Sequence, residues 1–185
     1  MNPQIHAALA MHDFFFKNLK LNYAVIGGIA LVFWGEPRFT RDVDITIQDK
    51  LDLADLVKAA TEAFGSRVSD PYRFARDTRM LLLNVEDIEV DVAIALQGYE
   101  DSLFERSQAF EVAPRRQLYI CSAEDLIIHK ALAGRPQDLT DIQGVIYRQG
   151  DGLDVQHIRS WLTKFSKALA DDAVLGRFEG AWTNR

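Results

Sequence analysis

Residues 23–47 read YAVIGGIALVFWGEPRFTRDVDITI, and this stretch decides the fold. A short apolar run ends in Gly27 and Gly28 and leads directly into a second apolar run, 29–34, of helical length. A glycine and a proline then break the pattern, and a third apolar run follows them. The order predicts a strand, a glycine turn, a helix and a second strand.

The second predicted strand carries two aspartates, Asp42 and Asp44. Because alternate residues of a strand face the same side, the two carboxylates lie side by side while Val43, Ile45 and Ile47 face the core. Carboxylate oxygens are the ligands that hard divalent cations prefer. The stretch therefore predicts a metal site on the polar face of this strand.

A third carboxylate comes from a predicted hairpin with strands at 80–85 and 88–96. In its second strand, branched apolar residues alternate with Glu89, Asp91 and two alanines. If this strand lies next to the first pair of aspartates, Asp91 is the third carboxylate and Glu89 the alternative. Two unit charges ~4 Å apart repel by roughly 4 kcal/mol at an effective dielectric of about 20, so the cluster requires a cation. Mg²⁺ or Mn²⁺ would offset the repulsion.

The two glycines have two interpretations. One is a tight turn with close packing, which needs no ligand. The other is a phosphate site, because glycine exposes the backbone N–H groups of a helix N-terminus, where the helix dipole favours negative charge.

Helical patterns account for most of the remaining chain. Asn2 caps a first packing helix, a second helix ends at Gly65, and 66–78 is expected to be a loop with at most a short strand. The later elements are expected as a helix at 99–109, a closing strand at 117–121, and helices from Ser122 onward. This pattern divides the chain into a strand-containing core, 1–121, and a helical region, 122–185.

A buried lysine is expected in the helical region. Lys130 shares the apolar helix face of Leu126 and Ile127, and a lysine placed there needs a partner. Asp138 and Asp141 stand at the edge of the buried stripe of the next helix. An interhelical ion pair and a contact with a nucleotide both fit this pattern.

Composition narrows the functional classes. The chain has 185 residues, 48% hydrophobic and 26% charged, with a formal net charge of −6, which argues against bulk nucleic-acid binding. Cys121 is the single cysteine, so an intrachain disulfide is excluded and a reducing compartment is favoured. No run is long enough to span a bilayer and no signal pattern is present, which favours a cytoplasmic protein. Basic residues for a local patch are Arg38, Arg41, Arg115 and Arg116.

Taken together, 23–95 resembles the nucleotidyltransferase superfamily with its polymerase-β-like core. Three motifs narrow the resemblance: R-x-T-x-D-V-D at 38–44, E-D-L-I-I-H-K at 124–130 and R-P-Q-D-L-T-D-I at 135–142. They are similar to the abortive-infection nucleotidyltransferase toxins of the AbiEii type. One departure is Ile29 after Gly28, where relatives often carry a small hydroxyl residue that touches phosphate.

The resemblance implies an α+β fold, with a mixed β-sheet flanked by helices and an α-helical C-terminal region. It implies transfer of a nucleoside monophosphate from an NTP to an acceptor hydroxyl with Mg²⁺ or Mn²⁺. The acceptor would be RNA, such as tRNA, or a small molecule, and an antitoxin protein would be a partner of a toxin. The implied metal ligands are Asp42, Asp44 and Asp91. The implied nucleotide-binding residues are Gly27, Gly28, Arg38, Thr40, Asp138 and Asp141, with Lys130 reaching the phosphates.

Other classes fit less of the sequence. A small-molecule adenylyltransferase keeps the same chemistry, and a degenerate nucleotidyltransferase acting as a binding module is the non-enzymatic alternative. A D-x-D glycosyltransferase is disfavoured because the chain is short for such a fold and Asp91 stays unexplained. The histidines show no metal-ligand spacing; they are His6, His12, His129 and His157.

Overall fold

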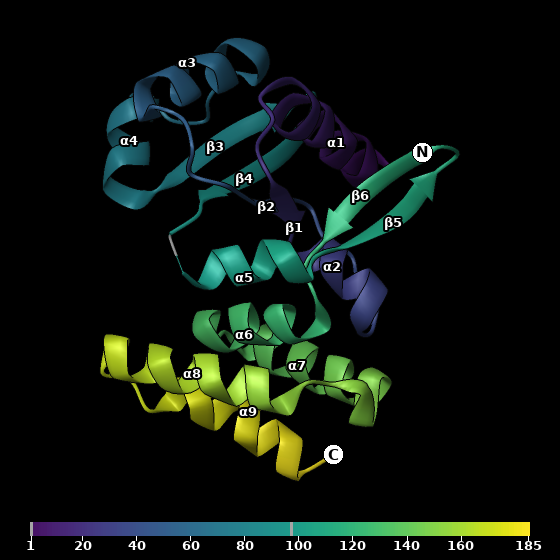
Figure 1. Ribbon diagram of the computed structural model, residues 1–185. Coiled ribbons are helices and arrows are strands. Elements are labelled where there is room, and N and C mark those ends of the chain that lie inside the picture. The colour runs from purple at the N-terminus through teal and green to yellow at the C-terminus, as the bar shows by residue number, and fades with distance from the viewer. Residues whose placement is uncertain (1, 97) are drawn as a thin grey trace. The chain divides into compact units, whose positions relative to one another are not determined.

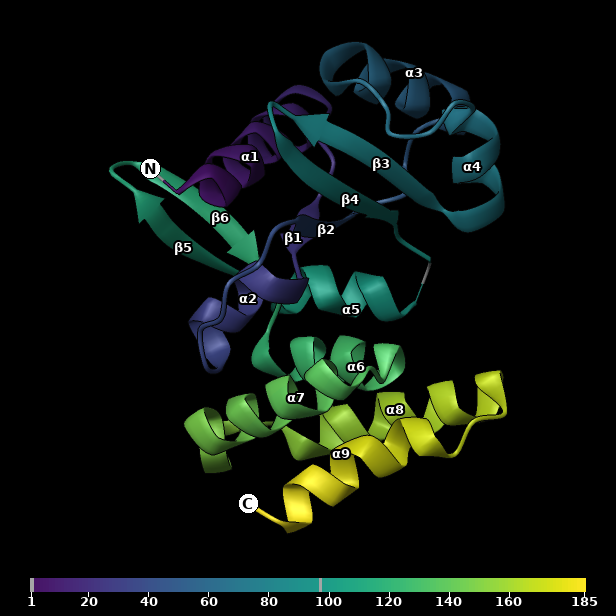
Figure 2. The same cartoon turned by 180° about the vertical axis from the view of Figure 1, so that it is seen from behind.

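The computed structural model describes residues 2–96 and 98–185. The chain divides into two compact units, one made of the segment up to Ile29 with Phe39–Ile120, the other of Ala30–Arg38 with Cys121–Arg185. Figure 1 labels the elements of each unit, and Figure 2 shows the same elements from behind. Among the described helices, none combines the length and the apolar character needed to cross a bilayer.

A mixed sheet forms the first unit. In the described chain its strands are β1 (Tyr23–Val25), β2 (Val43–Ile47), β3 (Met80–Val85), β4 (Ile88–Ile94), β5 (Gln108–Ala113) and β6 (Arg116–Ile120). Their order is β3-β4-β2-β1-β6-β5. The pairs β2/β4 and β1/β6 are parallel, and the pairs β1/β2, β3/β4 and β5/β6 are antiparallel. The mixed sheet and its flanking helices confirm the α+β fold that the resemblance implied.

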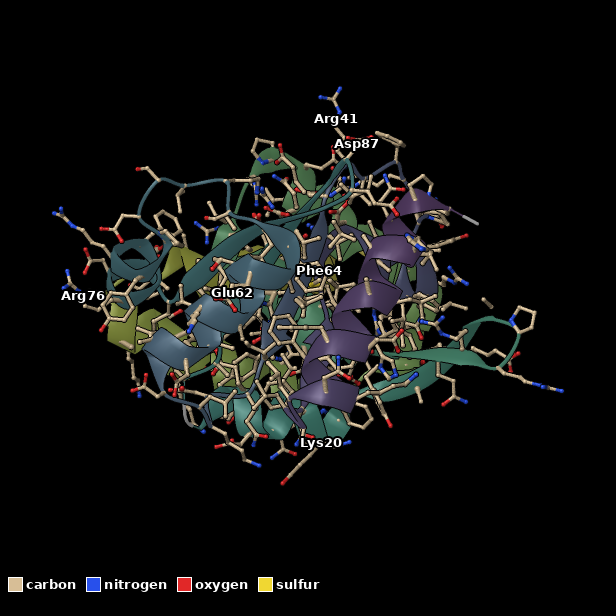
Figure 3. The ribbon with its side chains drawn as sticks, turned by 90° about the horizontal axis from the view of Figure 1, so that it is seen from above. Lys20, Arg41, Glu62, Phe64, Arg76 and Asp87 are labelled. Atoms are coloured by element: carbon tan, nitrogen blue, oxygen red, sulfur yellow. The ribbon has the colours of Figure 1, made fainter. Side chains whose placement is uncertain are left out.

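Helices pack against this sheet. They are α1 (Pro3–Met11), the π-helical turn η1 (His12–Asn18), α3 (Leu53–Phe64), α4 (Pro71–Thr78) and α5 (Tyr99–Arg106). The side chain of Asn2 caps α1 as predicted, accepting the N–H groups of Gln4 and Ile5 at 2.8 and 3.3 Å. Phe14 of η1 meets Phe64 of α3 edge to face, with 5.0 Å between ring centroids; Figure 3 labels Phe64.

Strand β2 begins at Val43, so Asp42, which was predicted on the strand beside Asp44, lies in the preceding loop. Val43, Ile45 and Ile47 are completely buried in the core, whereas Asp44 is only partly buried. The neighbouring strand β4 buries Val90 and Val92 in the same way. The apolar residues therefore anchor the strands, and the acidic residues stand on the other face.

The second unit is helical. It contains most of α2 (Gly27–Trp34), then α6 (Ala123–Ala133), α7 (Pro136–Gln149), the short η2 (Gly150–Gly152), α8 (Val155–Leu169) and α9 (Ala173–Thr183). Ser122 caps α6, its Oγ accepting the N–H of Asp125 at 3.1 Å. The indole N–H of Trp34 donates to the carbonyl oxygen of Cys121 at 2.7 Å. Arg148 donates to the carbonyl oxygen of Gly35 at 2.8 Å, so polar bonds hold the 30–38 segment in this unit.

Two predicted segments are wrong. The segment 66–78 contains helix α4, whose N-terminus is marked by the Asp70 cap, which accepts the N–H of Arg73 at 3.0 Å, and by Pro71 in the first turn. Helix α5 ends at Arg106, and the edge strand β5 begins where the predicted helix would continue.

Candidate functional site

The glycine turn lies directly against the acidic strand. Gly27 opens α2 with a φ of +63°, in the left-handed region, and the N–H of Ile26 donates to the carbonyl oxygen of Asp44 at 2.9 Å. A Cβ on Gly27 would lie 2.0 Å from Asp44 Oδ2, and one on Gly28 would lie 2.6 Å from Thr40 Oγ1. Only glycine permits this approach. The first turn of α2, where backbone N–H groups lack helical partners, therefore lies beside Asp44 and Thr40.

We expect Gly27→Ala to destabilise the protein, whereas Gly176→Ala in α9 should not. Gly27 has a φ of +63°, so alanine there carries a left-handed cost of about 1–2 kcal/mol. Its methyl group would also meet Asp44, and overpacking of this kind costs about 1–3 kcal/mol more. Gly176 lies inside a helix with no atom within 4 Å of an added Cβ, so alanine is tolerated there. Urea unfolding followed by circular dichroism measures the difference, and equal losses would contradict the close approach.

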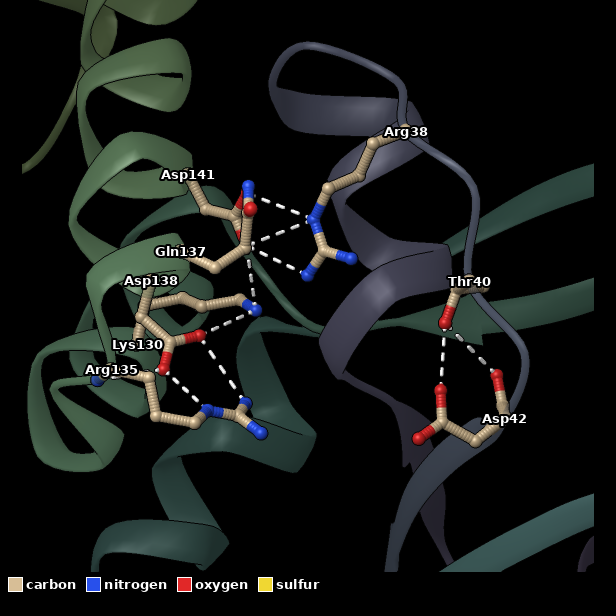
Figure 4. A network of polar contacts seen from close by, with 8 residues as sticks. All are labelled: Arg38, Thr40, Asp42, Lys130, Arg135, Gln137, Asp138 and Asp141. Atoms are coloured by element: carbon tan, nitrogen blue, oxygen red, sulfur yellow. Dashed lines mark hydrogen bonds and ion pairs between the residues drawn. The ribbon is translucent and has the colours of Figure 1, made fainter.

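The loop before β2 is ordered by its own side chains. Thr40 Oγ1 donates to Asp42 Oδ1 at 2.8 Å, as Figure 4 shows. The side chain of Gln4 donates to the carbonyl oxygen of Thr40 at 3.0 Å and ties the loop to α1. Asp42 therefore keeps one oxygen on Thr40, and its carboxylate is partly buried.

Strand register places Asp44 and Asp91 side by side. Strands β2 and β4 are parallel neighbours, and Asp44 pairs with Asp91. The prediction that these two strands are adjacent is confirmed. Register partners on neighbouring strands point to the same face of a sheet, so both carboxylates belong to the polar face.

Asp91 is paired with an arginine, Arg67, that was not among the predicted site residues. Arg67 forms an ion pair through Nη2 with Asp91 Oδ1, and its Nη1 lies 2.9 Å from Glu89 Oε2. Glu89 and Asp91 therefore share the guanidinium group of Arg67. Arg67 follows α3 in the stretch expected to be a loop, where no periodicity or motif marked it.

The residues present fit a magnesium ion held by two carboxylates. Within 2–96 and 98–185, no three His, Cys, Asp or Glu side chains gather in a metal-binding group. Mg²⁺ usually takes one or two carboxylates and completes its shell with water and substrate phosphate. Asp42 and Asp44 supply such oxygens, and the absence of a Cβ at Gly27 lets the Asp44 carboxylate lie directly against the glycine turn.

A buried ion network occupies the helical unit. Lys130 of α6 is 4% exposed, and its Nζ lies 3.0 Å from Asp138 Oδ1 and 2.9 Å from Asp141 Oδ2 (Figure 4). Both aspartates are on α7 and are buried, not at the edge of the stripe as predicted. The interhelical ion pair, one of the two interpretations of Lys130, is therefore present.

Arginines complete the network. Arg38 forms a bidentate ion pair with Asp141, with Nε 3.0 Å from Oδ1 and Nη2 3.0 Å from Oδ2. Arg135 Nε lies 2.8 Å from Asp138 Oδ2. Each aspartate thus receives Lys130 and one arginine. Arg135 begins the motif at 135–142, but its contact with Asp138 was missed. The i,i+3 spacing at the start of α7 is the signal that could have revealed it.

The network shifts the proton affinity of its members. Burial by itself raises the pKa of Asp138, but hydrogen bonds from Arg135 and Lys130 outweigh it and hold the pKa below its usual value. Burial acts in the same direction on Asp141, and the bonds from Arg38 and Lys130 lower its pKa in the same way. The hydrogen bond to Asp141 raises the pKa of Arg38.

These shifts predict an acid-sensitive stability. A carboxyl group whose pKa is lower in the folded state stabilises the fold above its unfolded pKa, near 3.8, and loses that contribution as the pH falls through the folded value. We therefore expect the free energy of unfolding to fall below about pH 3.8. Asp138→Asn should flatten this fall. Urea titrations between pH 2 and 6 measure it, and an unchanged slope in the variant would contradict the assignment.

The other candidate residues lie outside these two groups. Arg116 Nη2 lies 2.7 Å from Asp13 Oδ2, so its guanidinium is engaged, whereas Arg41 and Arg115 are exposed. The structure places these histidines in no metal-binding group among the described residues: His6, His12, His129 and His157.

Comparison with known proteins shows the family and the fold. Residues 6–183 match the family described as "Nucleotidyltransferase of unknown function (DUF6036)". The fold resembles the solution structure of the antibiotic-resistance factor ANT(2″)-Ia, with 19% identity, coverage of 91% of this chain and 94% of that chain, and a TM-score of 0.59.

Two further structures are more distant. An antigenic nucleotidyltransferase-like protein from Paracoccidioides brasiliensis shares 15% identity over 94% of this chain and 93% of that one, with a TM-score of 0.46. A putative nucleotidyltransferase from Thermotoga maritima shares 17% identity over 89% and 96%, with a TM-score of 0.48. Comparison with curated proteins gives no match. Since the family match extends over nearly the whole sequence, the chain belongs to the nucleotidyltransferase family DUF6036.

Proposed function

We propose that this chain is a metal-dependent nucleotidyltransferase that moves a nucleoside monophosphate from an NTP to an acceptor hydroxyl. The proposal rests on one arrangement: Asp44 stands against the glycine turn of α2 and in register with Asp91. The turn offers N–H donors for phosphate, and β2 with the loop before it offers carboxylates for a cation, in the same unit.

Each residue then has a task. The first turn of α2 holds the triphosphate, Asp42 and Asp44 hold the divalent cation, and Thr40 keeps Asp42 in position through its 2.8 Å bond. Bound there, Mg²⁺ supplies charge stabilisation for the oxygens that enter and leave. The acceptor oxygen attacks the α-phosphorus in line, the bond to the pyrophosphate oxygen breaks, and pyrophosphate departs. Asp91 would complete a second metal site or take the proton that the acceptor hydroxyl releases.

The helical network has a proposed part as well. Three cationic side chains surround two carboxylates, so the network carries one excess positive charge. Arg38 and Thr40 belong to the same motif at 38–44. Arg38 and Lys130 are proposed to favour binding of the NTP phosphates, with Asp138 and Asp141 orienting the two cations.

Two acceptors are proposed. RNA, such as tRNA, follows from the resemblance to AbiEii-type toxins, and it brings an antitoxin protein as a partner. A small-molecule hydroxyl is favoured by the net charge of −6 and by the engagement of Arg116 with Asp13, because both reduce the attraction for an RNA backbone.

One experiment separates the acceptors and tests the chemistry. The protein is incubated with each α-labelled NTP and Mg²⁺ or Mn²⁺, together with total tRNA in one set and a panel of aminoglycosides in the other. Label on either acceptor supports transfer and identifies its class. If no acceptor is labelled and neither nucleotide nor metal binds, the chain is a non-enzymatic module and the proposal fails.

A further inference from the structure

Two aspartates are neighbours on the polar face of β2 and β4, and an arginine of the chain is paired with one of them. Asp44 and Asp91 are register partners on parallel strands, so their like charges are close together without a metal. The structure places a cation of the chain itself at this point, because Arg67 forms an ion pair with Asp91 Oδ1. An internal guanidinium therefore offsets part of the repulsion that a metal ion would otherwise offset.

Arg67 is built into the sheet and is not a loosely attached surface residue. Its backbone N–H donates to the carbonyl oxygen of Leu82 on β3 at 2.9 Å, and its side chain is 20% exposed. The guanidinium bridges two acids on the same face of β4, with Nη1 at 2.9 Å from Glu89 Oε2. Its Nε is buried without a hydrogen-bond partner, so the side chain gives up one bond to hold this position.

We propose that Arg67 is the resident counter-ion of Asp91 and competes with the divalent cation for that carboxylate, which lowers the metal affinity of the nucleotide-free site. This inference rests on the proposed function of the same site. Asp91 Oδ1 is occupied by Arg67, so a cation that ligates this oxygen must first displace the guanidinium. Asp42 and Asp44 then carry the metal until the NTP phosphates add their own ligands.

Glu89 makes the displacement reversible. When Asp91 turns to a metal ion, the bond from Nη1 to Glu89 still holds Arg67 beside β4. The guanidinium therefore stays within reach and returns to Asp91 after the product and the metal leave. Arg67 is a positioning residue in this scheme, because it acts on Asp91 and not on the nucleotide.

Titration of the full-length, nucleotide-free protein with Mn²⁺, with the free ion followed by electron paramagnetic resonance, tests the competition. Arg67→Met removes the guanidinium and should bind Mn²⁺ about tenfold more tightly, the factor that one charge-assisted hydrogen bond provides. Arg67→Lys keeps the charge but bridges the two acids less well, so it should show a smaller gain. This second variant also carries the test if Arg67→Met does not fold.

Controls separate competition from a general charge effect. Arg76→Met makes the same charge change at an exposed arginine that is bound to Asp77, and it should leave Mn²⁺ affinity unchanged. Asp44→Asn should lose Mn²⁺ binding. If the wild type binds Mn²⁺ through Asp44 and Arg67→Met binds no more tightly, the role of Arg67 is overturned while the proposed function stands. If neither the wild type nor Arg67→Met binds Mn²⁺, both are overturned.

Discussion

Replacing Lys130 with methionine is expected to lower the free energy of unfolding of the helical unit by about 3 kcal/mol or more. The variant keeps the hydrocarbon chain but leaves two buried carboxylates without their shared partner, and breaking a buried ion pair costs roughly 3–5 kcal/mol. Arg38 and Arg135 remain on the aspartates, which favours the lower end of that range. The melting temperature should fall on the order of 10 °C.

The chain supplies its own reporter for this measurement. All its tryptophans lie in the helical unit, at positions 34, 161 and 182, so tryptophan fluorescence follows the unfolding of that unit. Lys167→Met is the matched control, because Lys167 is exposed at the end of α8. Adding Asp138→Asn to the Lys130 variant should restore part of the loss, since it removes one unpaired charge. A Lys130 variant as stable as the Lys167 variant would contradict the structural role of the network.

Much of the sheet could be predicted from the sequence because its strands are patterned by burial. In β4 the apolar residues alternate with polar ones, and the acids Glu86 and Asp87 occupy the turn before it, so the hairpin and its boundaries follow. The register of Asp44 with Asp91 required one further assumption, that the two acidic strands are neighbours. The structure supports that assumption.

Two elements with little buried surface were missed. Helix α4 has eight residues and buries one of them, Ala75, so its apolar face is too short to stand out, and its cap at Asp70 with Pro71 is the clearer signal. Strand β5 lies at the edge of the sheet and none of its residues is fully buried. The helix predicted at 99–109 therefore extended into Gln108 and Ala109, the first two residues of β5. Propensity and periodicity report burial, and these two elements have little of it.

The candidate site was predictable in its acids but not in its counter-ions. The alternating spacing of carboxylates on a strand can be recognised in the sequence. Arg67 is 24 residues away from Asp91 in the sequence and lies in the irregular segment between α3 and α4. Arg38 reaches Asp141 over 103 residues. Contacts made by long, flexible side chains at such separations depend on tertiary structure, and a single sequence does not encode them as a local pattern.

The boundary between the two units also differs from the predicted one, and no change in composition marks it. Residues 30–38 lie within the predicted core, but the structure groups them with the helical region, where Trp34 and Gly35 bond to Cys121 and Arg148. Consequently the motif at 38–44 begins in one unit and ends in the other. A substitution at Arg38 is therefore expected to report on the helical network, and one at Thr40 on the acidic strand.

Asp44→Asn should reduce nucleotidyl transfer by about 10³–10⁵-fold, the range seen when a charge-stabilising group is lost from a phosphoryl-transfer site. The residue stands between the glycine turn and Asp91, and the amide gives up the negative charge that binds the cation. Stability should be retained or improved, because a like charge next to Asp91 is removed. Initial rates with labelled NTP and a thermal melt measure the two effects together.

Asp87→Asn gives the matched control for this variant. It makes the same change of charge in the exposed turn between β3 and β4, and Figure 3 labels its position. It should leave both transfer and Mn²⁺ binding at the wild-type level, so that only a change on the polar face of β2 removes them. If the Asp44 variant keeps full activity, the cation is not held by this strand, and the nucleotidyltransferase mechanism proposed for the site is wrong even though the fold remains.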